Sequence, residues 1–264
     1  MFSKSSLSFL TSNQKIKIRK ITKKPNISLI RNEILKGNFP RPQFGLGILM
    51  GFLQASQLNY KNISILEFNL LDDEDALIDL INYSKIFESL FKIKTNVFSI
   101  RYNFNFVKKT IFDRKYEFSN IKEKSKKYYN KKFPLNYIDG DNPREITKIK
   151  KALEKAPLAF CSFDLKNNTI TNKALKLFKT QKELFLPRAV VYFDHLFKSN
   201  ENEGEYLSII DFNRKSKNKK ISSLMELSEQ LSTYWFKWLF LGKRIKILAS
   251  FDHRKYSFKC KKLF

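Results

Sequence analysis

Short apolar segments alternate with helix-like segments along most of this chain. The predicted strands are Asn62–Phe68, Thr95–Ile100, a short Asn136–Ile138, Pro157–Leu165, Arg188–Leu196 and Ile245–Phe251. The predicted helices are Phe44–Leu58, Asp73–Phe91, Pro143–Ala156, Asn172–Lys182, Gly204–Asn213 and Leu227–Leu241. Strands that are apolar throughout, without alternation of polar residues, are typical of a parallel sheet buried on both faces. The pattern therefore predicts an α/β fold with a mostly parallel sheet and helices on both faces.

The N-terminal part of the chain has a different composition. No Asp or Glu occurs in the first 32 residues, which contain several serines and eight basic residues. We expect residues 1–37 to form a basic, partly ordered arm and residues 38–264 to form a single α/β domain. An organelle-targeting segment is the alternative interpretation of the arm, although such segments are usually richer in arginine.

Positive charge dominates the whole chain, with 51 Lys and Arg against 25 Asp and Glu. Only 10 of the 51 are arginine, the residue that bonds phosphate oxygens in pairs, so a solvated lysine-rich surface is the first interpretation. The charge still predicts non-specific attraction to polyanions. Specific RNA binding is a further alternative, and its best segment is Phe104–Tyr129, where aromatic residues are interspersed among lysines.

Several classes of protein are excluded or disfavoured by the sequence. The longest nearly uncharged apolar run is Phe44–Leu53, about half of the roughly 20 residues that a transmembrane helix needs. Two cysteines cannot build a disulfide framework, which favours a reducing, cytoplasmic compartment. The chain contains no phosphate-binding loop, serine-hydrolase elbow or dinucleotide-binding glycine motif.

Polar residues at strand ends are the candidate functional residues. Ligands of parallel α/β folds bind beyond the carboxyl ends of the strands, where the strand order reverses. The residues at these positions are Glu67, Asn69, Arg101, Asp139, Asp164, Asp194 and His195.

Four sequence blocks, taken together, resemble a known family. They are ISILEF at Ile63–Phe68, APLAFCSFDL with a following Thr at Ala156–Thr171, LPRAVVYFDH with GEYLSIIDFN at Leu186–Asn213, and FDHRKY at Phe251–Tyr256. Over Asn38–Tyr256 the chain resembles an uncharacterised bacterial family of class I S-adenosylmethionine-dependent methyltransferase-like proteins. These are distantly similar to metal-dependent sugar O-methyltransferases of macrolide biosynthesis. The resemblance implies a Rossmann-like sheet and O-methyl transfer to a small or sugar-like acceptor.

The resemblance also implies roles for individual residues. Glu67, Asn69 and Asp139 would lie at the S-adenosylmethionine cofactor. A divalent metal such as Mg²⁺ or Mn²⁺ would be bound by Asp164, Asp194 and His195, and of these Asp164 and His195 would be catalytic.

The sequence departs from the family pattern at the cofactor positions. Asn69–Asp73 stands where the family has a glycine-rich turn, and the second strand ends at Arg101 where the family has an acid. Beside the two metal-binding aspartates, Lys166 and His195 replace the family's second acids.

Structural roles are the alternative for each candidate. Asp164, Asp194 and Glu67 are residue types that also cap helices, and a lone histidine such as His195 is more often a hydrogen-bonded structural residue. At the level of the whole protein, the alternative is a degenerate, non-catalytic relative that binds a partner or a polyanion.

Overall fold

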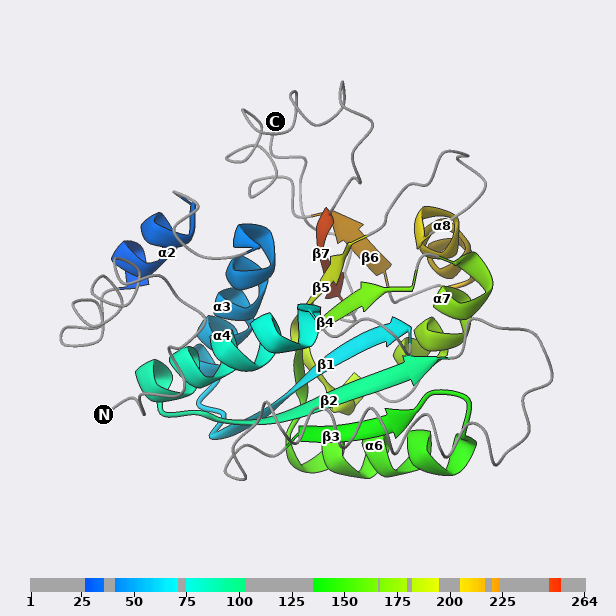
Figure 1. The fold of residues 1–264 in the computed structure, drawn as a ribbon, viewed down its shortest axis with the longest axis horizontal. Coiled ribbons are helices and arrows are strands. Elements are labelled where there is room, and N and C mark those ends of the chain that lie inside the picture. Colours follow the sequence, from blue (N-terminus) through cyan, green and yellow to red (C-terminus); the bar gives the residue numbers. More distant parts are fainter. Residues whose placement is uncertain are drawn as a thin grey trace, which may run out of the picture.

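A computed structural model describes residues 27–35, 41–70, 75–102, 135–165, 167–179, 182–194, 205–216, 220–223 and 247–252 (Figure 1). These residues form a seven-stranded sheet of order β3-β2-β1-β4-β5-β7-β6. Strands β1 to β5 are parallel to one another, whereas β7 is antiparallel to both β5 and β6. The order reverses between β1 and β4, as expected for a Rossmann-like α/β fold. The predicted fold class is confirmed.

The described strands are β1 Asn62–Leu70, β2 Lys94–Tyr102, β3 Leu135–Asp139, β4 Leu158–Asp164, β5 Phe185–Phe193, β6 Lys220–Ser223 and β7 Ile247–Asp252. Six of the described strands correspond to predicted segments, with ends that differ by up to three residues; β5 begins and ends three residues before its predicted bounds Arg188–Leu196. Among the described strands, β6 alone has no counterpart in the sequence prediction, because its four residues, KISS, carry too little apolar character to stand out.

Helices cover both faces of the sheet (Figure 1). One face is covered by α2 Ile27–Leu35, α3 Pro42–Gln57 and α4 Asp75–Phe91. The other is covered by α6 Pro143–Lys155, α7 Asn168–Ala174, the 3₁₀ turns η2 Leu175–Lys179 and η3 Lys182–Leu184, and α8 Glu205–Lys215. Each face buries its own apolar cluster, so the strands are enclosed as their uninterrupted apolar character predicted.

Glycine in α3 serves packing against the sheet. A Cβ atom at Gly51 would lie 3.0 Å from the carbonyl oxygen of Ala159 in β4, tighter than ordinary contact. The missing side chain therefore lets the helix approach the strand closely. Among the described residues, no helix is both long and apolar enough to cross a membrane.

Two helices differ from their sequence predictions. The helix predicted at Asn172–Lys182 is wrong at both ends, since α7 runs from Asn168 to Ala174 and the 3₁₀ turn η2 follows it. Helix α7 begins earlier because the Asn167 side chain accepts a hydrogen bond from the Ile170 backbone N–H at 3.1 Å and caps it. The expected N-terminal arm contains α2, in which Ile30 and Ile34 are buried in the same cluster as α3 and α4. The domain boundary at residue 38 stays a prediction, and the helix predicted at 227–241 lies outside the described residues.

Candidate functional site

The carboxyl ends of the five parallel strands carry two rows of mostly polar side chains on the face covered by α3 and α4. The outer row pairs Asp139, Arg101, Asn69 and Asp164 across β3, β2, β1 and β4, and Asp194 follows β5 at the same level. The inner row, two residues earlier, pairs Tyr137, Ser99, Glu67, Ser162 and Tyr192. Side chains two residues apart share one face of a strand, so the rows form a continuous polar edge.

Two residues before the inner row, the side chains on the same face of the sheet are apolar. There the corresponding positions are Ile65, Val97, Phe160 and Val190, which belong to the cluster beneath α3 and α4. On the opposite face of β1 and β4, Phe68 and Phe163 stack with ring centroids 4.6 Å apart. The two polar rows thus lie on one face at the carboxyl ends of the strands, the position at which α/β folds bind ligands.

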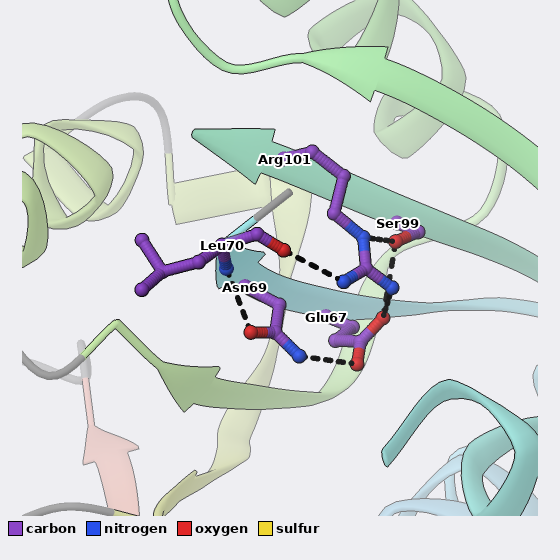
Figure 2. Close-up of polar contacts among 5 residues, drawn as sticks. All are labelled: Glu67, Asn69, Leu70, Ser99 and Arg101. Atoms are coloured by element: carbon purple, nitrogen blue, oxygen red, sulfur yellow. Dashed lines mark hydrogen bonds and ion pairs between the residues drawn. The ribbon is translucent and has the colours of Figure 1, made fainter. Parts of the chain in front are cut away.

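A buried ion pair joins the first two strands at this edge (Figure 2). Nη2 of Arg101 lies 3.1 Å from Oε2 of Glu67, and both side chains are 0% exposed. The guanidinium also donates through Nε to the Ser99 hydroxyl at 2.7 Å and through Nη1 to the Leu70 carbonyl at 2.9 Å. Arg101 therefore extends from the end of β2 across the end of β1 and is bonded at each of its three nitrogens.

Glu67 is bonded from three directions. Besides Arg101, its carboxylate accepts hydrogen bonds from the Ser99 hydroxyl at 3.0 Å and from the Asn69 side-chain amide at 3.3 Å. The Asn69 carbonyl in turn accepts the Leu70 backbone N–H at 2.7 Å (Figure 2). Removing one partner of such a buried pair costs about 3–5 kcal/mol because an uncompensated charge stays behind.

The β4–β5 half of the edge is arranged differently. Asp164 ends β4 and Asp194 follows β5, and both are 3% exposed. The Asp194 backbone N–H donates to the Phe163 carbonyl at 2.9 Å, which holds the two aspartates on adjacent strands. The Tyr192 hydroxyl donates to the Asp194 carboxylate at 2.8 Å. Burial, together with the negative charge and hydrogen bond of Asp194, raises the pKa of Tyr192 well above its ordinary value, so this hydroxyl stays protonated.

A cation from outside the sheet faces these aspartates. Arg41 precedes α3 with a left-handed φ of 45°, and its Nε lies 3.2 Å from a carboxylate oxygen of Asp79 in α4. Burial by itself lowers the pKa of Arg41, but the charges of Asp194, Asp79 and Asp164, together with Tyr192, outweigh it and raise the pKa above its ordinary value. The Arg41 side chain is 23% exposed, unlike that of Arg101, although its Nη1 atom is buried.

Asp139 closes the outer row on the β3 side. Its carboxylate accepts the Asp141 backbone N–H at 2.9 Å, and its own backbone N–H donates to Glu145 at 2.8 Å. Asp141 pairs with Lys173 of α7. These contacts tie the end of β3 to the first turn of α6, a structural role that the sequence prediction did not include.

The structure brings most of the predicted site residues to one edge. Asn69, Asp139, Asp164 and Asp194 share the outer row, and Glu67 lies in the inner row. The alternative that Asp164 caps the next helix is wrong, because Asn167 caps α7. Glu67 lies inside β1, which continues to Leu70. His195 lies outside the described residues.

Two contributors were missed by sequence reasoning. Arg41 had a recognisable signal, since it is the charged residue immediately before a helix, α3, that contains no charged residue. The sequence predicts that Tyr192 is a core residue, and it is buried, but its hydroxyl also donates a hydrogen bond to Asp194. The polar contacts of Arg41 and Tyr192 are visible only in the structure.

The described residues contain no group of three or more His, Cys, Asp or Glu side chains arranged to hold a metal ion. Asp164 and Asp194 supply two of the three predicted ligands, and the third, His195, is not among the residues described. The metal site therefore stays a prediction.

The described residues do not fit S-adenosylmethionine held in the way that the resemblance implies. That arrangement needs an acceptor at the end of β2 for the ribose hydroxyls, and the guanidinium of Arg101 has donors only. The same guanidinium engages Glu67, the acid expected to face the cofactor. Its positive charge would also oppose the cationic sulfonium of the cofactor.

Comparisons with known proteins add little at this level of similarity. No family model and no curated protein matches the chain. Among solved structures, it is similar to CalS11, a TDP-rhamnose 3'-O-methyltransferase of calicheamicin biosynthesis, with 13% identity, 92% of this chain and 97% of that chain covered, and a TM-score of 0.43. It is also similar to MNMC2 from Aquifex aeolicus, with 16% identity, 75% and 55% covered, and a TM-score of 0.37. Neither an activity nor a fold follows from likenesses this weak.

Proposed function

We propose that this chain is a non-catalytic relative of the methyltransferase-like family, which retains the α/β scaffold and uses it to bind a partner. The observation that carries the proposal is the Glu67–Arg101 ion pair, 0% exposed on both sides, at the ends of β1 and β2. In the family pattern this position holds an acid and the cofactor. Here an internal guanidinium supplies the positive charge that the buried Glu67 requires.

Energetics argue against displacement of Arg101 by a cofactor. Moving the guanidinium away would leave Glu67 buried without its cation, at a cost of about 3–5 kcal/mol. Because each 1.4 kcal/mol is a factor of ten, this cost lowers cofactor affinity by about two to four orders of magnitude. A cofactor that bound an open site with a dissociation constant of about 1 μM would bind here with one of about 0.1 to 10 mM.

Calorimetric titration of the full chain with S-adenosylmethionine tests the proposal. We expect no saturable binding up to millimolar cofactor, with or without Mg²⁺ or Mn²⁺. Glu67→Gln serves as the matched variant, since a cofactor held at the family position would lose affinity with it. Saturable micromolar binding that Glu67→Gln weakens would overturn the proposal.

S-adenosylmethionine-dependent O-methyl transfer to a small or sugar-like acceptor is the second candidate. It is favoured by the two buried aspartates, Asp164 and Asp194, on adjacent strand ends. In this candidate they and His195 would bind Mg²⁺ or Mn²⁺, and Asp164 and His195 would act on the acceptor hydroxyl. Carboxylate oxygens suit Mg²⁺, and a histidine would shift preference toward Mn²⁺.

Thermal unfolding in the presence of metal separates the two candidates. The second predicts that Mn²⁺ raises the melting temperature and that Asp194→Asn, which still accepts the Tyr192 hydrogen bond, abolishes the rise. The non-catalytic proposal predicts the same melting temperature with and without metal in both proteins. A metal-dependent rise that is lost in the variant would favour the second candidate.

A further inference from the structure

The exposed face of α6 carries four basic residues in a line, which we call the α6 stripe. They are Arg144, Lys148, Lys151 and Lys155, and all four are exposed. Their spacing of four, three and four residues places them on one side of a helix, over about 16 Å of its length. The opposite side packs against the sheet through the fully buried Ile149 and Leu153.

General lysine enrichment does not account for the α6 stripe, as comparison with α8 shows. Both helices lie on the same face of the sheet (Figure 1). The 13 residues of α6 include five basic and two acidic residues. The 11 residues of α8 include two of each, and its exposed positions include Tyr206 and Ile210. If lysine were enriched at every exposed position, both helices would carry an excess of basic residues. Only α6 of the two does.

More basic residues adjoin α6 on the same face. Lys173, Lys176 and Lys179 of α7 and η2 are exposed, and these two elements contain no acidic residue. Asp141, just before α6, already pairs with Lys173. Positive charge on neighbouring elements of one rigid face creates a field that attracts polyanions.

The chemistry of α6 selects among polyanions. A helix that binds a membrane surface inserts apolar side chains, but the exposed residues of α6 are Pro143, Arg144, Thr147, Lys148, Lys151, Glu154 and Lys155. Stacking on bases needs aromatic side chains, and α6 has none. Contact with a row of backbone phosphates needs only positive charges at regular spacing along a rigid element.

We propose that the α6 stripe binds the phosphate backbone of single-stranded nucleic acid, tested here with RNA, without reading its sequence. This inference names the partner for the binding function proposed above and rests on it. Each phosphate neutralised on a single strand contributes about 0.7 to the slope of log affinity against log salt, so four contacts contribute about 2.8.

The test compares two variants of the full chain that lose the same charge. The stripe variant is Arg144→Gln, Lys148→Gln, Lys151→Gln and Lys155→Gln. The control variant is Arg188→Gln, Lys61→Gln, Lys92→Gln and Lys94→Gln, again one arginine and three exposed lysines, but outside α6. Binding of a fluorescein-labelled oligouridylate is followed by anisotropy between about 50 and 200 mM salt. Circular dichroism checks that both variants keep the fold.

We expect the stripe variant to lower the magnitude of the salt slope by about 2.8 and the control variant to change it by much less. Equal losses in both variants would show a diffuse charge effect and overturn the inference, as would wild-type protein that does not bind the RNA. Stripe-dependent binding to anionic vesicles but not to RNA would assign the face to membranes instead. The stripe variant leaves Glu67 and Arg101 intact, so its outcome is independent of the cofactor titration.

Discussion

The cations at the two halves of the polar edge come from different elements and differ in exposure. In the β1–β2 half, the cation Arg101 comes from a neighbouring strand and is 0% exposed. In the β4–β5 half, the cation Arg41 comes from the start of a helix outside the sheet and is 23% exposed. Arg101 is packed on all sides and closes its half of the edge, whereas Arg41 keeps part of its side chain exposed even though Asp164 and Asp194 are buried.

The largest expected effect belongs to the closed half. Arg101→Met should lower the free energy of unfolding by about 3–5 kcal/mol, because Glu67 is left buried without a cation. Glu67→Met should cost a comparable amount. The double variant should recover most of the loss, since a buried ion pair replaced by packed apolar groups is often neutral. Urea unfolding followed by circular dichroism measures all three.

Additive losses in this double-mutant cycle would mean that Glu67 and Arg101 act independently. The ion pair would then contribute nothing to the difference in stability that we expect between the two halves.

A smaller effect is expected from Tyr192→Phe in the β4–β5 half. It removes a hydrogen bond to a charged carboxylate and should cost about 1.5–3 kcal/mol at neutral pH. A cost near zero would show that water replaces the hydroxyl at Asp194 and that this half is more open than its burial indicates.

The same variant should change the pH dependence of stability. The pKa of Tyr192 is raised in the folded protein, so above the unfolded value of about 10 the native state holds a proton that the unfolded state releases. Its contribution is therefore complete below pH of about 10 and is lost as pH rises toward the folded pKa. Tyr192→Phe should make the alkaline loss of stability less steep, by at most about 1.4 kcal/mol per pH unit. Unchanged steepness would mean that Tyr192 does not hold its proton more strongly in the folded protein than in the unfolded chain.

The smallest effect is expected from Arg41→Gln. Its ion pair with Asp79 is partly exposed, and such pairs contribute about 1 kcal/mol or less. Molar salt should reduce this contribution further by screening, but should leave the effect of Arg101→Met nearly unchanged. If Arg41→Gln lowered the free energy of unfolding as much as Arg101→Met, the two cations would be equally shielded from solvent.

Much of this edge was predictable before any coordinates. Asp139, Asp164 and Asp194 were placed at strand ends, and each does lie at or immediately after the end of its strand. Arg101 was recognised as a departure from the family pattern but without its partner. Glu67 and Arg101 are 34 residues apart, and only the pairing of β1 with β2 makes them neighbours.

The packing role of Gly51 in α3 is another feature that the sequence alone does not show. As a sequence feature, Gly51 weakens a predicted helix because glycine has low helix propensity. In the structure, the missing side chain is what lets α3 approach β4 at Ala159.

The sequence by itself determined the order of strands and helices, the burial of the sheet and the placement of polar residues at the carboxyl ends. These follow from hydrophobicity, which is recorded residue by residue along the chain. The tertiary structure decided which charges neutralise one another, because an ion pair acts over a few ångströms and depends on strand order and register. Those are set by packing of the whole sheet, which is why the closing of one half by Arg101 was visible only in three dimensions.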